Sequence, residues 1–431
     1  MDIALIICGK FDPNMNYRRP KGTKDILPRD IYKWHFVEKT IAEVMFNFNF
    51  SEIRTPAFEH TELFARGVGD ETDIVGKEMY TFTDKGGESI TLKPEMTAPV
   101  MRAYIENSMG AESQLHKLYY ITNMYRYERP QAGRYREHTQ VGAEIIGSES
   151  FQSDIELIVL AKEIYNRCGI NNFKVKINSI GKSEDKKRYT ALLKDFLKDN
   201  INELSEDSRR RFEKNPLRIL DSKNPKDKAL TDNAPKILDN LSDESKRRFD
   251  KVVNGLTALG VDYEIDFRLV RGLDYYSDTT FEFVSQDLGA QDAIGGGGRY
   301  DGLIETLGGK STPGIGFGSG IERIIIVAEK NNFKFEEAGK IKIYFIALND
   351  EAREISLKLA IDLRRNNYPC ETDLLDRSFK AQMREANKMN AEFVYITGEE
   401  EIKNGKGILK NMSDSSQTGI EFRKLLERIK G

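Results

Sequence analysis

The spacing of hydrophobic positions predicts where the chain forms helices and where it forms strands. Apolar residues recur every three or four positions from Ile31 to Met45, a pattern typical of an amphipathic helix. Residues 115–127 and 137–146 are rich in β-branched and aromatic residues, which predicts two long antiparallel strands. The connecting residues 128–136 contain a proline and a glycine, so we expect an exposed loop.

The same pattern predicts further elements on both sides of this hairpin. We expect Thr97 to cap the helix that follows Pro94. Strands are predicted over residues 50–56, about 90–93, 173–180, 263–270, 279–284 and 314–320, and helices over residues 152–168 and 320–329.

Two changes in this pattern indicate domain boundaries. Residues 182–262 are dense in charge and helical in periodicity, which favours an inserted helical subdomain. From about Lys340, strands alternate with helices, as in a small α/β domain with a parallel or mixed sheet. We therefore predict an α+β protein with a first domain of residues 1–335, the insertion within it, and a second domain of residues 336–431.

Composition narrows the functional classes only slightly. The formal net charge is −3, so the overall charge gives no indication of nucleic-acid binding. The three cysteines are scattered and the four histidines lack metal-ligand spacing, which argues against a disulfide framework and a transition-metal centre. The apolar opening is too short for a membrane span, and we expect a cytoplasmic protein without membrane contact. The basic runs 209–211 and 246–248 fit solvated helix faces as well as RNA contacts.

The second strand of the hairpin carries a candidate small-molecule site. Side chains alternate along a strand, so Gln140, Gly142 and Glu144 share one face. We expect Gly142 to leave a gap between the two polar side chains, with Arg126 beside the turn. An amide, a carboxylate and a guanidinium around one pocket suit a zwitterionic ligand, although a polar solvent-facing sheet would show the same pattern.

Arg271 follows a strand-like apolar run and precedes a glycine and two tyrosines. A buried arginine needs an anionic partner, either a protein carboxylate or a bound carboxylate or phosphate. Both alternatives fit this segment, Leu269–Tyr276, equally well.

Two glycine-rich segments lie further along the chain. Residues 295–298 lack the spacing of phosphate-binding loops, and we expect them to let backbone approach a flat ligand such as adenine. Residues 314–320 alternate glycine with other residues, which predicts a strand with one bare face on which a purine could lie. Arg323 follows and could reach a phosphate, and Glu322 could help to hold Mg²⁺. Three arginines with Mg²⁺ suit in-line attack on phosphorus.

Together these segments resemble a class II aminoacyl-tRNA synthetase, and within that class the histidyl-tRNA synthetase family. Three segments resemble motifs 1, 2 and 3 of the class, in this order: residues 50–59, residues 125–131 with the return strand, and residues 314–323. Two further segments resemble the signature segments of the family: Leu269–Tyr276 and Gly297–Gly302. The family pattern is also matched by residues 19–25 and 93–97. The resemblance begins near residue 17 and extends over almost the whole remaining chain.

The resemblance implies a class II antiparallel sheet with flanking helices, activation of L-histidine by ATP with Mg²⁺, and transfer to tRNA(His). It implies that Arg126 and Arg271 are catalytic. The implied histidine-binding residues are Glu95, Met96, Thr97, Arg126, Gln140, Glu144, Arg271, Tyr275 and Tyr276. The implied ATP-binding residues are Arg126, Glu128 and Arg323, and Arg129 and Gln131 would contact the tRNA acceptor end. The family also implies a homodimer, formed at motif 1, and an anticodon-binding domain at residues 336–431.

Three alternatives remain at this point. A non-catalytic paralogue could share the fold as a regulatory subunit of histidine biosynthesis, although Arg271 and the last domain argue against it. A tRNA or histidine sensor could also retain the fold. A kinase-like phosphotransferase is disfavoured because the phosphate-loop spacing is missing.

Overall fold

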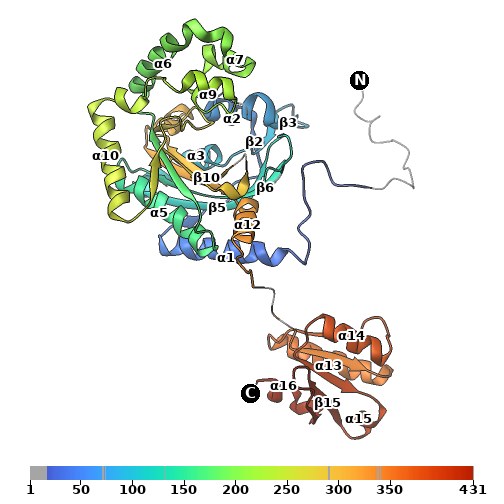
Figure 1. Ribbon diagram of the computed structural model, residues 1–431. Helices are drawn as coiled ribbons and strands as arrows, with labels where there is room; N and C mark the ends of the chain where they lie inside the picture. Colours follow the sequence, from blue (N-terminus) through green and yellow to red (C-terminus); the bar gives the residue numbers. More distant parts are fainter. Residues whose placement is uncertain are drawn as a thin grey trace, which may run out of the picture. The chain divides into compact units, whose positions relative to one another are not determined.

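The computed structural model describes residues 17–69, 72, 74–131, 133–289, 292–336, 339 and 341–430. The apolar opening of the chain and Cys8 lie outside these residues. The chain divides into two compact units, Met1–Glu336 and Glu337–Gly431 (Figure 1). No helix in the described part of the chain is long and apolar enough to cross a membrane.

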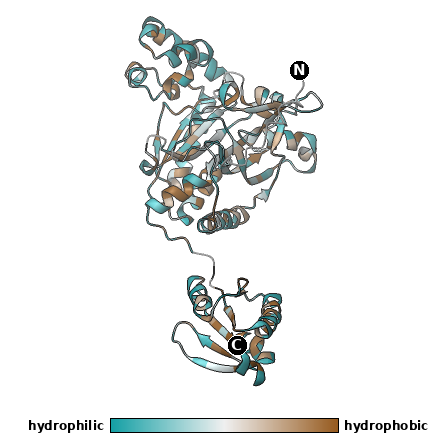
Figure 2. Cartoon of the chain, turned by 90° about the vertical axis from the view of Figure 1, so that its right-hand side faces the viewer, coloured by the Kyte–Doolittle hydropathy of each residue, from teal (hydrophilic) through white to brown (hydrophobic). Residues whose placement is uncertain are grey.

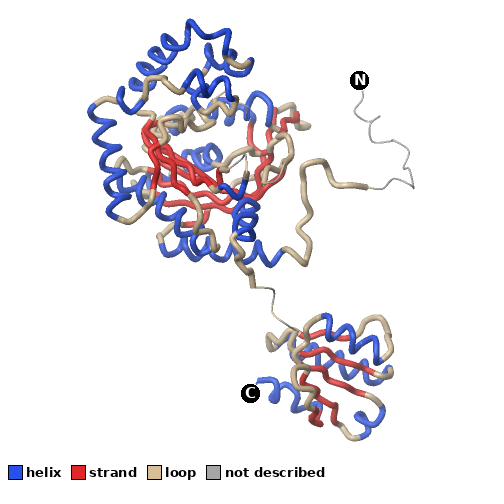
Figure 3. Tube along the Cα trace, in the orientation of Figure 1, coloured by secondary structure: helices blue, strands red, loops and turns tan. Residues whose placement is uncertain are grey.

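An eight-stranded sheet organises the first unit (Figure 3). In spatial order its strands are β1 (Ser51–Glu52), β5 (His116–Tyr125), β6 (Glu137–Ile146), β11 (Gly314–Gly320), β10 (Ala293–Arg299), β9 (Ser277–Val284), β7 (Lys174–Ser179) and β8 (Tyr263–Ile265). The six central strands are antiparallel, and only the two edge strands pair in parallel. The predicted antiparallel α+β fold is confirmed.

One face of this sheet is covered by helices. They are α1 (Ile31–Asn47), α5 (Phe151–Arg167), α10 (Asp243–Ala258) and α12 (Ile321–Lys330). The inward face of α1 and the apolar residues Val141, Ala143 and Ile145 of β6 belong to the same buried cluster. Because side chains alternate along β6, Gln140 and Glu144 point to the opposite face. The helices thus leave one polar face of the sheet for a site.

Smaller elements border that polar face. They are α2 (Thr61–Val68), a π-helix (Ile74–Glu78), α3 (Thr97–Glu106), α4 (Met109–Glu112), α11 (Leu303–Thr306), and a three-stranded antiparallel sheet of β2 (Phe58–His60), β4 (Ser89–Leu92) and β3 (Tyr80–Thr83). The sequence patterns predicted β4 and α3 but not β2 and β3, which are short and largely exposed.

Most of the helical insertion packs around a second hydrophobic core, whereas its helix α10 packs in the core behind the sheet. Its elements are α6 (Ser183–Leu197), a 3-10 helix (Lys198–Glu203), α7 (Glu206–Lys214), α8 (Leu217–Leu220), α9 (Pro225–Thr231), a second 3-10 helix (Ile237–Asn240) and α10.

The insertion contains a short sequence repeat. Residues 204–214 (LSEDSRRRFEK) and 241–251 (LSDESKRRFDK) share their pattern, and in each copy two serines donate hydrogen bonds to one buried aspartate, Asp227 or Asp185. The third basic residue of each copy binds protein: Arg211 donates to the carbonyl of Arg218, and Arg248 to Asp154. These two arginines therefore act structurally.

The second unit is a mixed sheet with helices. Its strands, in order, are β13 (Cys370–Thr372), β12 (Ile343–Ala347), β14 (Phe393–Thr397), β15 (Lys406–Asn411) and β16 (Gln417–Glu421), and its helices are α13 (Asp350–Arg365), α14 (Phe379–Lys388), α15 (Glu399–Lys403), a 3-10 helix (Phe422–Lys424) and α16 (Leu425–Lys430). Hydrophobic residues gather on the strands (Figure 2), and β12 is buried throughout. The predicted mixed α/β character is confirmed, whereas β16 was not predicted.

Two predicted strands are much shorter than expected. The first is only β1, because the chain soon reaches Pro56, which has no N–H for a ladder. The strand predicted to reach Val270 is only β8, since a turn closes at Asp266, where the N–H of Leu269 donates to the Asp266 carbonyl (2.9 Å). The segment that carries Arg271 therefore has no regular secondary structure.

Arg299, at the end of β10, joins the sheet to the helices behind it. Its side chain is fully buried and donates to Asp154 of α5, to Asp301 (2.9 Å) and to the carbonyl of Ser148 (2.9 Å). Arg248 of the insertion binds the same Asp154 (2.7 Å). One buried ionic network thus connects β10, α5 and the insertion.

We predict that Arg299→Met lowers the free energy of unfolding of the first unit by about 3–5 kcal/mol, because buried carboxylates lose their partner. Urea unfolding followed by the fluorescence of Trp34, the single tryptophan of the chain, measures this. The control is Arg167→Met, which removes an exposed helical ion pair to Glu163 and should change stability by less than about 0.5 kcal/mol. Equal effects of the two substitutions would contradict the structural role of Arg299.

Candidate active site

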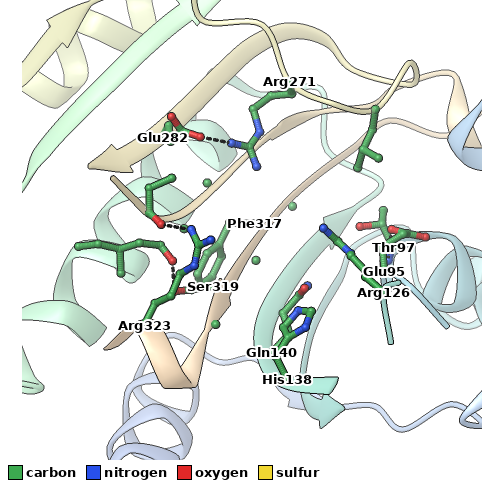
Figure 4. A pocket seen from close by; sticks show the side chains of 18 of the residues that line it. Glu95, Thr97, Arg126, His138, Gln140, Arg271, Glu282, Phe317, Ser319 and Arg323 are labelled. Carbon is green, nitrogen blue, oxygen red and sulfur yellow. Dashed lines mark hydrogen bonds and ion pairs between the residues drawn. The ribbon is translucent and has the colours of Figure 1, made fainter. Parts of the chain in front are cut away.

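A pocket lies on the polar face of the large sheet and gathers side chains from distant parts of the chain. Figure 4 shows Arg271 and Arg323 on one side and Arg126 opposite them, beside Glu95 and Thr97. The three arginines come from an irregular segment, from α12 and from the end of the β5–β6 hairpin. The structure therefore brings these three residues, which are far apart in the sequence, into one pocket.

The floor of the pocket is made of glycines on two paired strands. Gly296 of β10 faces Gly318 of β11, and Gly298 faces Gly316. A Cβ atom at Gly296 would lie 2.8 Å from Nη1 of Arg271, and one at Gly318 would lie 2.6 Å from the amide nitrogen of Gln140. Glycine is needed here because charged and polar side chains lie directly on the backbone.

This arrangement corrects two expectations from the sequence. The bare face of β11 was expected to receive a purine, but the space above Gly316 and Gly318 holds the side chains of Glu144 and Gln140. The gap expected at Gly142 is filled by the hydroxyl of Tyr120 on the neighbouring strand. The glycines allow the protein's own side chains to approach the sheet closely.

Arg271 is held by one strong ion pair. Its Nη1 donates to Glu282 of β9 (2.6 Å), while its Nε is buried without a hydrogen-bond partner among the described residues. A buried donor without an acceptor is costly, so an anionic ligand would compensate it. The ion pair with Glu282 is the protein carboxylate partner that the sequence allowed for, and an anion bound to Arg271 stays a prediction.

The other two arginines bind mainly backbone oxygens. Arg126 donates from Nε to the carbonyl of Pro94 (2.6 Å), and Arg323 donates to the carbonyls of Gly133 (2.8 Å) and Ala293. Burial lowers the pKa of Arg126, and burial together with the charges of Arg134 and Arg126 lowers the pKa of Arg323. The guanidinium groups repel one another, and this region of the pocket would attract a polyanion.

Glu95 marks the acidic end of the pocket. Its two oxygens accept hydrogen bonds from the N–H groups of Thr97 (2.8 Å) and Ala98 (2.9 Å) at the start of α3. Thr97 was predicted to cap this helix, but it is the first helical residue and Glu95 satisfies the free N–H groups. Burial raises the pKa of Glu95, against the opposing effect of these hydrogen bonds.

Glu144 lies against Gly316 of the floor but does not line the pocket. It is fully buried and accepts hydrogen bonds from the hydroxyls of Thr97 (3.1 Å), Tyr120 (3.4 Å) and Tyr300. Burial raises its pKa to about 8, because an ionised carboxylate is unfavourable in this enclosed position. Glu144 therefore reaches the pocket through the hydroxyl groups that surround it.

The structure sorts the residues that the resemblance implied. Those that line the pocket are Glu95, Thr97, Arg126, Glu128, Gln140, Arg271, Tyr275, Tyr276, Glu322 and Arg323. Those outside it are Met96, which is buried in a hydrophobic cluster, Glu144, which is fully buried against Gly316, and Arg129 and Gln131, which are exposed on the hairpin loop.

Glu322 is the residue that the sequence suggested for Mg²⁺. One of its oxygens accepts a hydrogen bond from the N–H of Thr139 (2.9 Å), and the other is buried without a hydrogen-bond partner. Within the described ranges, no three His, Cys, Asp or Glu side chains cluster in a way that could hold a metal. The free oxygen fits a single metal contact, with the remaining ligands coming from elsewhere.

Several pocket residues were missed by the sequence analysis. They are Tyr120, Arg134, Tyr135, His138, Glu282 and Tyr300. Tyr120 follows from the strand register, because it faces Gly142 across the hairpin. Burial, aided by Arg126 and Arg323, lowers the pKa of His138 to about 3, so its ring is neutral in the pocket. Glu282 and Tyr300 lie on segments that join the pocket only through the fold.

Comparison with known proteins agrees with this geometry. The model of the histidyl-tRNA synthetase family matches residues 22–324, and that of an anticodon-binding domain matches residues 325–431. The chain is 51% identical to the histidine–tRNA ligase of Thermoanaerobacter sp. (strain X514) over 96% of this chain and 99% of that protein. It is 49% identical to the histidine–tRNA ligase of Acetivibrio thermocellus over 95% of this chain and 99% of that protein.

A solved structure shows the same similarity. The crystal structure of apo histidyl-tRNA synthetase from S. aureus aligns with a TM-score of 0.82 and 37% sequence identity, over 96% of this chain and all (100%) of that chain. The similarity spans both units of the chain.

The raised pKa of Glu144 predicts a pH-dependent stability. The folded protein keeps this proton between the ordinary value of 4.5 and about 8, whereas the unfolded chain loses it. The free energy of unfolding of the wild type should therefore fall with rising pH in this window, relative to that of Glu144→Gln, which has no such proton. Urea unfolding at several pH values measures it, with Glu163→Gln on the exposed side of α5 as control. If the difference in free energy of unfolding between the wild type and Glu144→Gln did not change with pH, Glu144 would not be buried in its protonated form.

Proposed function

Because this chain belongs to the histidyl-tRNA synthetase family, it is an enzyme that attaches histidine to tRNA with ATP, and we propose that histidine is activated in the pocket on the glycine floor. The observation that carries this proposal is the layout of charge. Arg271 and Arg323 lie at one side of the pocket, and Arg126 lies opposite them, beside the carboxylate of Glu95. This layout suits a zwitterionic amino acid whose carboxylate meets a triphosphate.

Histidine would lie with its ammonium group at the acidic end. Glu95 and the hydroxyl of Thr97 are positioned to accept hydrogen bonds from the ammonium group. Gln140, Tyr275 and Tyr276 line the adjoining wall and would surround the imidazole. Glu144 would act on the same ring through the hydroxyls that donate to it.

The activation step would join the histidine carboxylate to the ATP α-phosphorus. A carboxylate oxygen attacks the phosphorus, the bond to the leaving pyrophosphate oxygen breaks, and histidyl-adenylate forms. Arg126 and Arg271 would hold the α-phosphate, where negative charge increases in the transition state. Arg323 would hold the γ-phosphate, and Glu128 would orient Arg126, whose Nη1 lies 3.9 Å from it. No proton transfer is required in this step.

Mg²⁺ would accompany the triphosphate. The unpartnered oxygen of Glu322 supports one contact to the ion, and phosphate oxygens would supply others. The ion would neutralise part of the charge on the phosphates.

The tRNA would meet both units. In the second step, a ribose hydroxyl at the tRNA end would attack the histidyl carbonyl, the bond from this carbon to the phosphate oxygen would break, and AMP would leave while the hydroxyl proton passes to its phosphate or to water. Arg129 and Gln131 are exposed on the hairpin loop at the pocket, where they could contact the acceptor end. Residues 336–431 would bind the anticodon, residues 1–335 would carry out catalysis, and residues 182–262 would form the inserted subdomain.

A homodimer formed at motif 1 completes the proposal. Two aromatic side chains near that motif are exposed in the single chain, Phe46 by 82% and Phe58 by 53%, and a partner subunit would cover them. The cytoplasm is the proposed location, because tRNA is the substrate. A regulatory-subunit role is not favoured, since the relatives that match over nearly the whole chain are ligases.

We expect histidine-dependent exchange of pyrophosphate into ATP by the wild-type protein. Arg271→Ala should lower kcat for exchange by about 10²–10³-fold, because an oriented charge at the α-phosphate is lost, while histidine binding largely persists. Isothermal titration with histidine gives the binding constant of the same variant.

Arg167→Ala is the control, since this arginine lies on α5 away from the pocket and pairs with Glu163. Absence of exchange by folded wild type would refute the proposed activity. Near-normal turnover by Arg271→Ala would refute only the role of Arg271.

A further inference from the structure

The segment from Leu269 to Tyr276 supplies a wall of the pocket but lacks regular secondary structure. Four of its side chains line the pocket: Arg271, Leu273, Tyr275 and Tyr276. A strand or helix fixes its residues through repeated backbone hydrogen bonds, and this segment has no such ladder. Its position must therefore depend on what packs against it.

The inserted subdomain packs against one side of the segment. Val270 and Tyr276 belong to the buried hydrophobic cluster of the insertion, together with Tyr189 and Leu193 of α6, and Leu273 and Tyr275 pack against that cluster. The insertion and the pocket wall thus share one core. Removing the insertion would expose the back of the residues that face the ligand.

Polar contacts from the insertion bind the backbone of the same segment. The ammonium group of Lys186, half-buried on α6, donates to the carbonyls of Tyr276 (2.9 Å) and Asp274 (3.2 Å). Asn215, which follows α7, donates to the side chain of Asp274 (2.6 Å). On the other side, the N–H of Asp274 donates to the carbonyl of Val68 at the end of α2 (3.2 Å).

We propose that Lys186 is a positioning residue for amino-acid recognition: its ammonium group fixes the backbone that presents Tyr275 and Tyr276 to the pocket. The inference rests on the proposed function of this pocket. Lys186 does not line the pocket, so it acts through the segment that it binds. A charged donor shared by two carbonyls that are two positions apart restrains both the position and the rotation of the backbone between them.

Lys186 is half-buried, so its hydrogen bonds to the two carbonyls lie partly out of water. Burial lowers its pKa, and Asp274 acts in the opposite direction. An ammonium group that is removed from water needs hydrogen-bond acceptors, and the two carbonyls supply them. Loss of the ammonium would leave both carbonyls without this donor at the junction of the insertion and the pocket.

The test compares two lysines of the same helix. Lys186→Met keeps the length of the aliphatic chain and removes the donor. Lys194→Met is the matched control, because Lys194 also donates to a backbone carbonyl, that of Glu213 (3.2 Å), but within the insertion. Histidine-dependent pyrophosphate exchange and thermal unfolding are measured for both variants in the full chain.

We expect Lys186→Met to raise KM for histidine about tenfold, with smaller changes in KM for ATP and in kcat, because a hydrogen bond from a charged donor is lost. Lys186→Arg should recover part of this loss, and Lys194→Met should leave KM for histidine within about twofold of wild type. A purely structural role would lower thermal stability and the active fraction without changing KM for histidine.

Asn215→Ala provides a second, independent variant, since it removes an exposed contact to the same segment. It should raise KM for histidine by about threefold. Suppose that the wild type catalyses exchange and that Lys186→Met and Asn215→Ala are folded. If both variants then kept the wild-type KM for histidine, the inference would be overturned. If the wild type itself showed no exchange, the proposed function would fail first.

Discussion

The close approach of side chains to a glycine backbone is the constraint on which the rest of this site depends. Gly296 and Gly298 of β10 lie beside Gly318 and Gly316 of β11 in the middle of the large sheet. Each lies directly under a side chain, and a methyl group at any of them would enter the space of that side chain. The bare backbone thus lets these side chains, which form or support the pocket, lie close to the sheet.

The remainder of the first unit keeps this floor in place. Helices cover the opposite face, and the buried Arg299 connects the end of β10 to α5 through Asp154. The insertion binds the same aspartate through Arg248 and also packs against the irregular segment that carries Arg271. The pocket therefore combines a rigid sheet with a wall whose position is set by an inserted subdomain.

Much of the architecture follows from local patterns in the sequence. The hairpin β5–β6, the helices α1 and α5 and the alternating elements of the second unit have strong periodicity, and these were predicted correctly. The short strand β1 and the early end of β8 were not, because a proline and a turn at Asp266 override their apolar composition. The resemblance of several segments to family motifs predicted the histidyl-tRNA synthetase family, and the comparisons with known proteins confirm this family.

The site was only partly predictable for a physical reason. Arg126, Arg271 and Arg323 carried a chemical signal of their own, since each lies beside a polar strand face, an apolar run or a glycine-rich strand where an arginine suits an anionic ligand. Tyr120 and Glu282 carried none, because their place in the pocket arises from strand register and packing. The function of the glycines was misread for the same reason: only the structure shows that Glu144 and Gln140 occupy the space above them.

Substitution of one floor glycine tests the central claim most directly. Gly316→Ala would place a methyl group against the flexible end of Glu144, while Gly419→Ala in β16, where nothing lies within 4 Å, serves as its control. The account predicts that Gly316→Ala folds normally by Trp34 fluorescence but raises KM for histidine in pyrophosphate exchange by about tenfold or more, as expected for the displacement of a buried polar group. A folded Gly316→Ala enzyme with the same KM for histidine as wild type and Gly419→Ala would contradict it.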